Sequence, residues 1–124
     1  VLYYGDPVKK QAKLLTGSGN DAVSVTNLTA SGANLVLFTT GNGNPFGAFV
    51  PTIKIAPTRR WQRKKRDWID FNAGQVLEEA SFEEAADRLF EMVLHVASGQ
   101  KQTKNEEFGY REIPFSAMAS FSRR

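Results

Sequence analysis

A short apolar run that ends in a glycine-rich loop constrains the fold of this chain more than any other feature. The run at residues 35–38 predicts a buried strand in a sheet that is covered on both faces. It ends at Thr39 and continues into a loop of glycine and asparagine that reaches Gly47, and a second apolar run at 49–55 leaves that loop. Open α/β sheets bind ligands in loops that follow strand ends, so this loop is a candidate binding site.

The loop offers hydroxyl groups, side-chain amides and glycine backbone that a ligand can approach closely. Such groups suit a polyhydroxylated or anionic small molecule. The candidate substrate ligands in the loop are Thr39, Thr40, Gly41, Asn42, Gly43 and Asn44. A tight connection that needs glycine at positive φ explains the same composition, and the spacing alone does not choose between the two interpretations.

Strand-like and helix-like segments alternate along the chain. Strands are predicted at residues 1–4, 35–39, 49–55, 68–72 and 111–115, and helices at 22–31, 59–66 and 82–97. This alternation predicts an α/β domain of three layers with a mainly parallel sheet. A length of 124 residues fits a single domain.

Capping residues mark the ends of two predicted helices. Asp21 is the expected N-cap of the helix at 22–31, and Gly32 is its expected C′ residue. Ser81 opens a capping box before the last helix, and Gly99 follows that helix. The apolar stripe of the last helix comprises Phe82, Ala85, Ala86, Leu89, Val93, Val96 and Ala97.

Other local patterns are less regular. Residues 5–7 predict a turn, residues 9–15 a short helical turn, and residues 100–107 a polar loop. Pro51 cannot donate a hydrogen bond to a neighbouring strand, so the run at 49–55 is expected to form an edge strand or an irregular one.

Composition excludes some kinds of site. The chain has no cysteine, which excludes disulfides and thiolate metal ligands. No apolar run approaches the ~20 residues of a membrane span, and no signal peptide is visible. A cytoplasmic protein without a membrane partner fits this composition.

Residues 59–66 form a basic run, with six arginines and lysines in eight positions. Because Trp61 and Trp68 are interleaved with it, this run could bind nucleic acid through charge and stacking. A solvated helix face is the simpler explanation, since no nucleic-acid-binding fold is recognisable, and a nucleic-acid partner is not expected. The positive potential could instead attract an anionic dicarboxylate.

Several motifs together resemble the carboxy-terminal part of the altronate/galactarate dehydratase family. They are GNDAVSVTNLTASGANLVL at 19–37, FTTGNGNPFGAFVPTIKIA at 38–56, WIDFNAG at 68–74 and VASG at 96–99. The resemblance runs from about residue 3 to about residue 113, in the expected order. NPFGAFVPT, WIDFNAG and FGYREI look closest to the galactarate branch, whereas GNG, in place of Gly-Arg-Gly, is similar to the sulfolactate sulfo-lyase relatives.

This resemblance carries expectations about fold and activity. It implies a Rossmann-like domain with a knotted crossover, and a hydro-lyase that dehydrates a sugar acid. It also implies a divalent metal, with iron suggested, and a homodimer. Family members are several times longer, so we expect the chain to be the carboxy-terminal domain of a longer polypeptide. The metal ligands and part of the catalytic set are then expected in the rest of that polypeptide, and the chain alone is expected to be inactive.

Dehydration of a sugar acid removes the proton α to a carboxylate and expels the β-hydroxyl, which requires a base, an acid and stabilisation of the enediolate. Lys54 is the candidate base or anion anchor, although an alternating strand also explains it. Asp70 and Asn72 lie near the carboxyl end of their predicted strand and are candidate substrate ligands, or else caps of turns. His95, the only histidine, is expected on the solvated face of its helix, and no His/Asp/Glu cluster has metal-ligand spacing.

Exposed apolar residues are expected where other parts of a larger protein cover the domain. Phe46, Phe49 and the edge at Tyr3 and Tyr4 are the predicted surface for a homodimer. A second hypothesis from another class is a binding or assembly module that uses the basic run.

Overall fold

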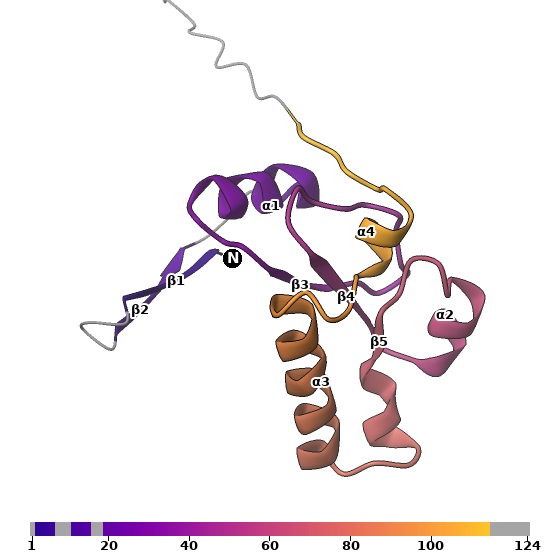
Figure 1. Cartoon of the computed structure of the whole chain (residues 1–124). Helices are drawn as coiled ribbons and strands as arrows, with labels where there is room; N and C mark the ends of the chain where they lie inside the picture. Colours follow the sequence, from indigo (N-terminus) through magenta and orange to yellow (C-terminus); the bar gives the residue numbers. More distant parts are fainter. Residues whose placement is uncertain (1, 7–10, 16–18, 115–124) are drawn as a thin grey trace, which may run out of the picture.

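The computed structural model describes residues 2–6, 11–15 and 19–114, with side chains from residue 19 onward. Within these ranges the protein has an α/β fold (Figure 1). Its elements in chain order are β1 (Leu2–Asp6), β2 (Gln11–Leu15), α1 (Asp21–Ala30), β3 (Val36–Thr39), β4 (Thr52–Ala56), α2 (Arg59–Lys64), β5 (Phe71–Asn72), the 3₁₀ helix η1 (Ala73–Leu77), α3 (Phe82–Ala97) and α4 (Lys104–Glu107).

The central sheet is parallel. Strands β3, β4 and β5 lie side by side in that order, with Val36 opposite Thr52 and Ile55 opposite Phe71. Because these strands run in one direction, their carboxyl ends meet at the same edge of the sheet. The predicted α/β class with a parallel sheet is confirmed.

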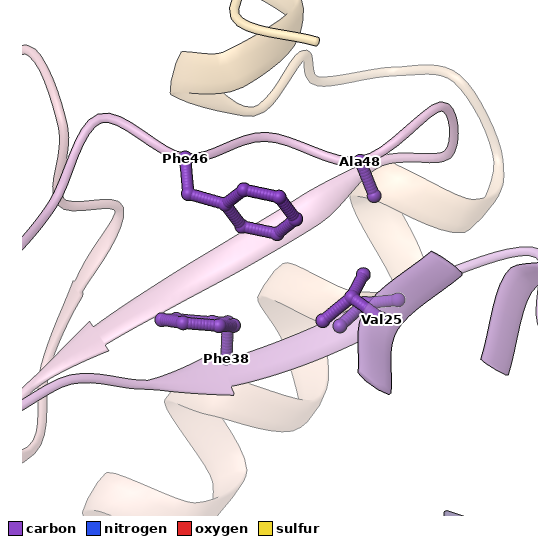
Figure 2. Packing of buried hydrophobic residues seen from close by; sticks show 5 residues of the cluster. Val25, Phe38, Phe46 and Ala48 are labelled. Atoms are coloured by element: carbon purple, nitrogen blue, oxygen red, sulfur yellow. The ribbon is translucent and has the colours of Figure 1, made fainter. Parts of the chain in front are cut away.

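One face of this sheet is covered by α1 and by the segment that follows the glycine loop. Val25 of α1 packs with Val36 and Phe38 of β3 and with Phe46 and Ala48 (Figure 2). The rings of Phe38 and Phe46 lie 5.8 Å apart. The prediction that Phe46 is exposed is therefore wrong, because the segment after the loop folds back over β3 and takes this ring into the core.

The other face is covered by α3. Val96 of that helix belongs to a cluster with Ile53 and Ile55 of β4 and Phe71 of β5. Residues that alternate along a strand point to opposite faces, so β4 contributes to both sides of the sheet. Figure 1 accordingly shows α1 and α3 on opposite sides of β3 and β4.

Strand β4 is central among the described strands, and the prediction of an edge or irregular strand is wrong. All five of its residues are buried. Pro51 lies just before it and accepts a hydrogen bond at its carbonyl oxygen from the Val36 N–H, at 2.9 Å, so its missing N–H leaves the pairing intact. In β3, by contrast, burial alternates and Leu37 is 50% exposed. The prediction of a buried strand at residues 35–38 is therefore wrong at Leu37, although helices pack on both faces of the sheet.

In the amino-terminal segment, strands β1 and β2 pair with each other in place of the predicted turn and helical turn. Gly5 pairs with Ala12 and Asp6 with Gln11 in antiparallel register, so the turn predicted at 5–7 and the helical turn predicted at 9–15 are wrong where these residues are described. Pairing with a second strand supplies hydrogen bonds that a local pattern does not reveal.

The two capped helices form nearly as predicted. The N-cap of α1 is Asn20, one residue before the predicted Asp21, and its Oδ1 accepts from the Val23 N–H at 3.1 Å. The capping box at Ser81 is confirmed, and Gly32 and Gly99 have φ values of 101° and 74° at the helix ends. Of the predicted stripe on α3, Ala85 and Val96 are buried, while other members, including Phe82, Ala86 and Ala97, are exposed. No helix in the described part of the chain is long and apolar enough to cross a membrane.

The segment predicted as a polar loop at 100–107 contains α4. Thr103 and Glu106 form a capping box at its start, and the side chain of Asn105 is 1% exposed. This side chain accepts a hydrogen bond from the Thr52 N–H at 3.0 Å, so α4 docks at the start of β4. Residues 111–114 form no strand, which contradicts the strand predicted at 111–115, and Phe115 lies outside the described residues.

Candidate functional site

A cavity of about 270 Å³ lies at the carboxyl edge of the parallel sheet. Its lining comes from the ends of β3, β4 and β5, namely Thr39, Thr40, Gly41, Ile55, Ala56, Pro57 and Ala73. This edge is where open α/β sheets bind their ligands. Three of the predicted substrate ligands, Thr39, Thr40 and Gly41, are thus brought together at one cavity.

Hydrogen bonds and one glycine at positive φ determine the conformation of the loop after Thr39. The Gly43 N–H donates to Thr40 Oγ1 at 2.9 Å, and the Thr40 N–H donates to the Ile55 carbonyl at 3.1 Å. Gly43 has a φ of 71°, a conformation that side chains other than glycine rarely adopt. The glycine at this position therefore serves the turn, whatever the loop binds.

Two lysines bind three consecutive carbonyl oxygens of the loop. Lys65 Nζ donates to the Asn42 and Gly43 oxygens at 2.7 and 2.9 Å. Lys54 Nζ donates to the Asn44 oxygen at 2.6 Å. The loop backbone is thus held by cations, and positive charge lies directly behind it.

Lys54 is buried in the centre of the sheet, with 1% of its surface exposed. Burial lowers the pKa of its ammonium group to about 8, although the charges of Asp70 and Glu112 oppose that shift. Its Nζ reaches the loop backbone at Asn44, and it is not among the residues that line the cavity. This geometry favours a positioning role, and its role as a base stays a prediction.

Asp70 binds backbone groups of two separate elements. Its Oδ2 accepts from the Lys54 N–H and its Oδ1 from the Lys104 N–H, both at 2.8 Å. Burial raises the pKa of the Asp70 carboxyl, and these two hydrogen bonds oppose that effect. The carboxylate thereby joins β4 to the start of α4.

Asn72 caps the 3₁₀ helix η1, since its Oδ1 accepts from the Gly74 N–H at 3.0 Å. Asp70 and Asn72 both line a second, polar cavity of about 320 Å³, away from the threonines. Its other lining residues are Arg59, Gln62, Phe71, Gln75, Glu78, Glu79, Arg88 and Met92. The structure therefore places Thr39, Thr40 and Gly41 at one cavity and Asp70 and Asn72 at another. Residues 42–44 line neither of these two cavities, and the roles of all the predicted ligands in binding stay predictions.

The basic run is not a uniform solvated face. Lys65 Nζ lies 5.2 Å from the ring centroid of Trp61 and 4.8 Å from that of Trp68, and it binds the loop. Arg59 forms ion pairs with Glu78 and Glu79. Arg59 is nevertheless exposed, as are Arg60, Arg63, Lys64 and Arg66. The basic run was predicted as one unit, and Lys65 was not predicted as a residue of the site; the flanking tryptophans were the available signal.

The described residues do not fit a metal site. They include no group of three or more histidine, cysteine, aspartate or glutamate side chains that could hold an ion. His95 is exposed in the last turn of α3, as predicted. No step of a reaction is therefore assigned to a metal bound by these residues.

Comparison with known families identifies the carboxy-terminal region of one of them. The family described as "D-galactarate/Altronate dehydratase, C-terminal" matches residues 1–120. The chain belongs to this family. The resemblance seen in the sequence motifs is confirmed.

Curated members of the family are similar over most of the chain. Altronate dehydratase of Escherichia coli (strain K12) is 41% identical over 114 residues, 91% of this chain and 23% of the relative. Altronate dehydratase of Bacillus subtilis (strain 168) is 44% identical over 115 residues, with the same coverage of 91% and 23%. Galactarate dehydratase (L-threo-forming) of E. coli K12 is 36% identical over 105 residues, 83% of this chain and 20% of the relative. The chain thus spans about a quarter of the length of these relatives or less.

Proposed function

We propose that this chain is the carboxy-terminal domain of a longer hydro-lyase that dehydrates a sugar acid of the altronate or galactarate type. The main support for this proposal is the cavity at the carboxyl edge of the sheet, beside the loop whose carbonyl groups bind Lys54 and Lys65. A sugar acid has a carboxylate and a row of hydroxyl groups. The threonine hydroxyls and loop amides can bind the hydroxyls, and the lysine charges behind the loop favour the anion.

In this proposal the reaction removes the α-proton and expels the β-hydroxyl, and the resulting enol becomes a 2-keto-3-deoxy acid. Thr39, Thr40 and residues 41–44 bind and orient the substrate. Lys54 shapes the loop through Asn44 and adds positive charge there. Asp70 holds β4 and α4 in place around this edge of the sheet.

The proposal extends to features that the described residues do not supply. A divalent metal, with iron suggested by the family resemblance, would be held together with further catalytic residues by the rest of the polypeptide. The Rossmann-like, knotted fold and the cytoplasmic location expected from the sequence are parts of the same proposal.

The substrate test uses the full-length enzyme. Altronate, galactarate and sulfolactate are supplied separately, and the 2-keto acid is measured with a carbonyl reagent. Identity to the two altronate dehydratases exceeds identity to the galactarate dehydratase, so altronate is expected to be the better substrate, although individual motifs favoured galactarate. Release of sulfite from sulfolactate, without 2-keto acid from either sugar acid, would favour a sulfo-lyase instead.

We also propose a homodimer through this domain. Phe49 is 54% exposed and Leu37 is 50% exposed, while the side chains of Tyr3 and Tyr4 lie outside the described part of the chain. Sedimentation at micromolar concentration is expected to show a dimer that chelators do not dissociate. A monomer at all concentrations would contradict this expectation.

A salt-sensitive mobility shift with nucleic acid would support the alternative of a binding module that uses the exposed arginines of 59–66.

A further inference from the structure

Lys65 fixes the glycine loop more completely than any other member of the basic run. Its Nζ binds two successive carbonyls, those of Asn42 and Gly43, at 2.7 and 2.9 Å. The same ammonium group lies against the rings of Trp61 and Trp68, where cation–π attraction opposes its movement. A Cβ on Gly43 would lie 3.0 Å from Lys65 Cδ, so the aliphatic stem also packs on the loop.

The neighbouring Lys64 provides an internal comparison. Its Nζ lies 6.0 Å from the Trp61 ring, and the side chain is exposed. In the part of the chain that the structure describes, no hydrogen bond joins Lys64 to the loop. Both lysines therefore place a positive charge at this end of α2, but of the two only Lys65 forms hydrogen bonds with the loop in the described part of the chain.

The contact continues from the loop into the cavity. The Asn42 carbonyl and the Gly43 N–H belong to the same peptide group. The carbonyl oxygen binds Lys65 Nζ, and the N–H donates to Thr40 Oγ1 at 2.9 Å. Thr40 lines the cavity. A hydroxyl group that accepts one hydrogen bond can still donate its own proton to another acceptor. Among the described residues, none accepts a hydrogen bond from the Thr40 hydroxyl. Its O–H is thus left to donate to a ligand.

We propose that Lys65 is a positioning residue, which sets the path of residues 42–43 and thereby makes the Thr40 hydroxyl a donor to an acceptor oxygen of the substrate. This proposal rests on the proposed function, because the acceptor is a carboxylate or hydroxyl oxygen of the sugar acid. Lys65 itself does not touch the substrate. Its effect passes through Gly43 to Thr40.

Steady-state kinetics of the full-length enzyme test this path with four variants. Lys65→Met keeps the aliphatic stem and removes the ammonium donors, and Lys64→Met is its matched control. Thr40→Val keeps the branched shape and removes the hydroxyl, and Thr40→Ser restores the hydroxyl. Loss of one hydrogen bond to a charged group predicts a fall in kcat/KM of about ten- to a hundredfold for Lys65→Met and for Thr40→Val, mainly through KM.

The controls separate this path from a general loss of charge or structure. Lys64→Met is expected to stay within about twofold of the parent enzyme, and Thr40→Ser is expected to recover most of the loss in Thr40→Val. The double variant Lys65→Met/Thr40→Val should lose little more than either single variant, because both remove the same contact. Fully additive losses would overturn the path from Lys65 to Thr40.

Hydrogen exchange of the loop amides gives a readout that does not require activity. Lys65→Met is expected to speed exchange at residues 41–44, and Lys64→Met is not. Unchanged exchange in Lys65→Met would overturn the ordering of the loop. Faster exchange with kcat/KM within twofold of the parent would overturn the positioning role. An enzyme inactive on every sugar acid, in which Lys65→Met still speeds exchange, would overturn the proposed function but retain the ordered loop.

Discussion

Replacement of Gly47 by alanine is expected to lower the free energy of unfolding by about 3 kcal/mol, as for severe overpacking of a core. A Cβ at this position would lie 1.9 Å from the carbonyl oxygen of Tyr110 and 2.7 Å from Asn105 Cβ. Neither neighbour can withdraw easily, because the Tyr110 N–H donates to the Asn105 oxygen and the Glu112 N–H donates to the Gly47 oxygen, both at 2.9 Å. Denaturant titration followed by circular dichroism measures the loss.

Gly41→Ala is the matched control for this prediction. Gly41 has no positive φ, and a Cβ there would meet nothing within 4 Å. Its stability is expected to change by less than about 0.5 kcal/mol. Equal stability of the two variants would show that the backbone of Tyr110 does not pack against Gly47 as described.

Replacement of Gly43 by valine is expected to reduce kcat/KM of the full-length enzyme about 100-fold or more, since displacements near 1 Å in a site have effects of that size. The φ of 71° strains a β-branched residue. The added carbons would also displace Lys65, whose Cδ lies 3.0 Å from the new Cβ position. The strain itself amounts to about 1–3 kcal/mol, so the domain should still fold. Kinetics with the active sugar acid and a thermal melt measure the two effects.

Gly109→Val separates backbone strain from damage to the loop. Gly109 has nearly the same φ, 70°, and a Cβ there would meet nothing within 4 Å. It follows α4, which docks at the start of β4 and so at the edge of the sheet opposite the cavity. We expect a similar loss of stability with kcat/KM within about threefold of the parent. Near-normal kinetics of Gly43→Val would show that this loop is not part of the site.

Periodicity and capping predicted the elements whose signals are local. The helix after Ser81 and the turn at Gly32 depend on residues within a few positions of each other, and both form as expected. The position of β4 in the sheet depends on the strands that flank it. The sequence of residues 49–55 does not show which strands those are. The strand pair of β1 and β2 likewise depends on contact between two segments. The four residues of α4 are too few to show a helical period.

The candidate site was predictable to a similar extent. Thr39, Thr40 and Gly41 follow directly from a strand that ends in a glycine loop, and parallel strands place that end at a cavity. The tryptophans beside Lys65 single it out, but its contact with the loop was not predictable, because its partner Asn42 lies 23 positions earlier in the chain. The hydrogen bonds of Asp70 could not be foreseen either, since they depend on α4 docking beside β4.

The docking of α4 has a consequence for the order of folding. The amide of Asn105 reaches back 53 positions to Thr52 and 57 positions to Ala48. During synthesis, β4 therefore cannot complete its contacts until the residues of α4 have left the ribosome. Such distant contacts slow folding, because their chain-closure entropy is lost before the stabilising contacts form. Until then the strand that bears Lys54 stays open at its start, and a chaperone that binds apolar strands has its best opportunity in that interval.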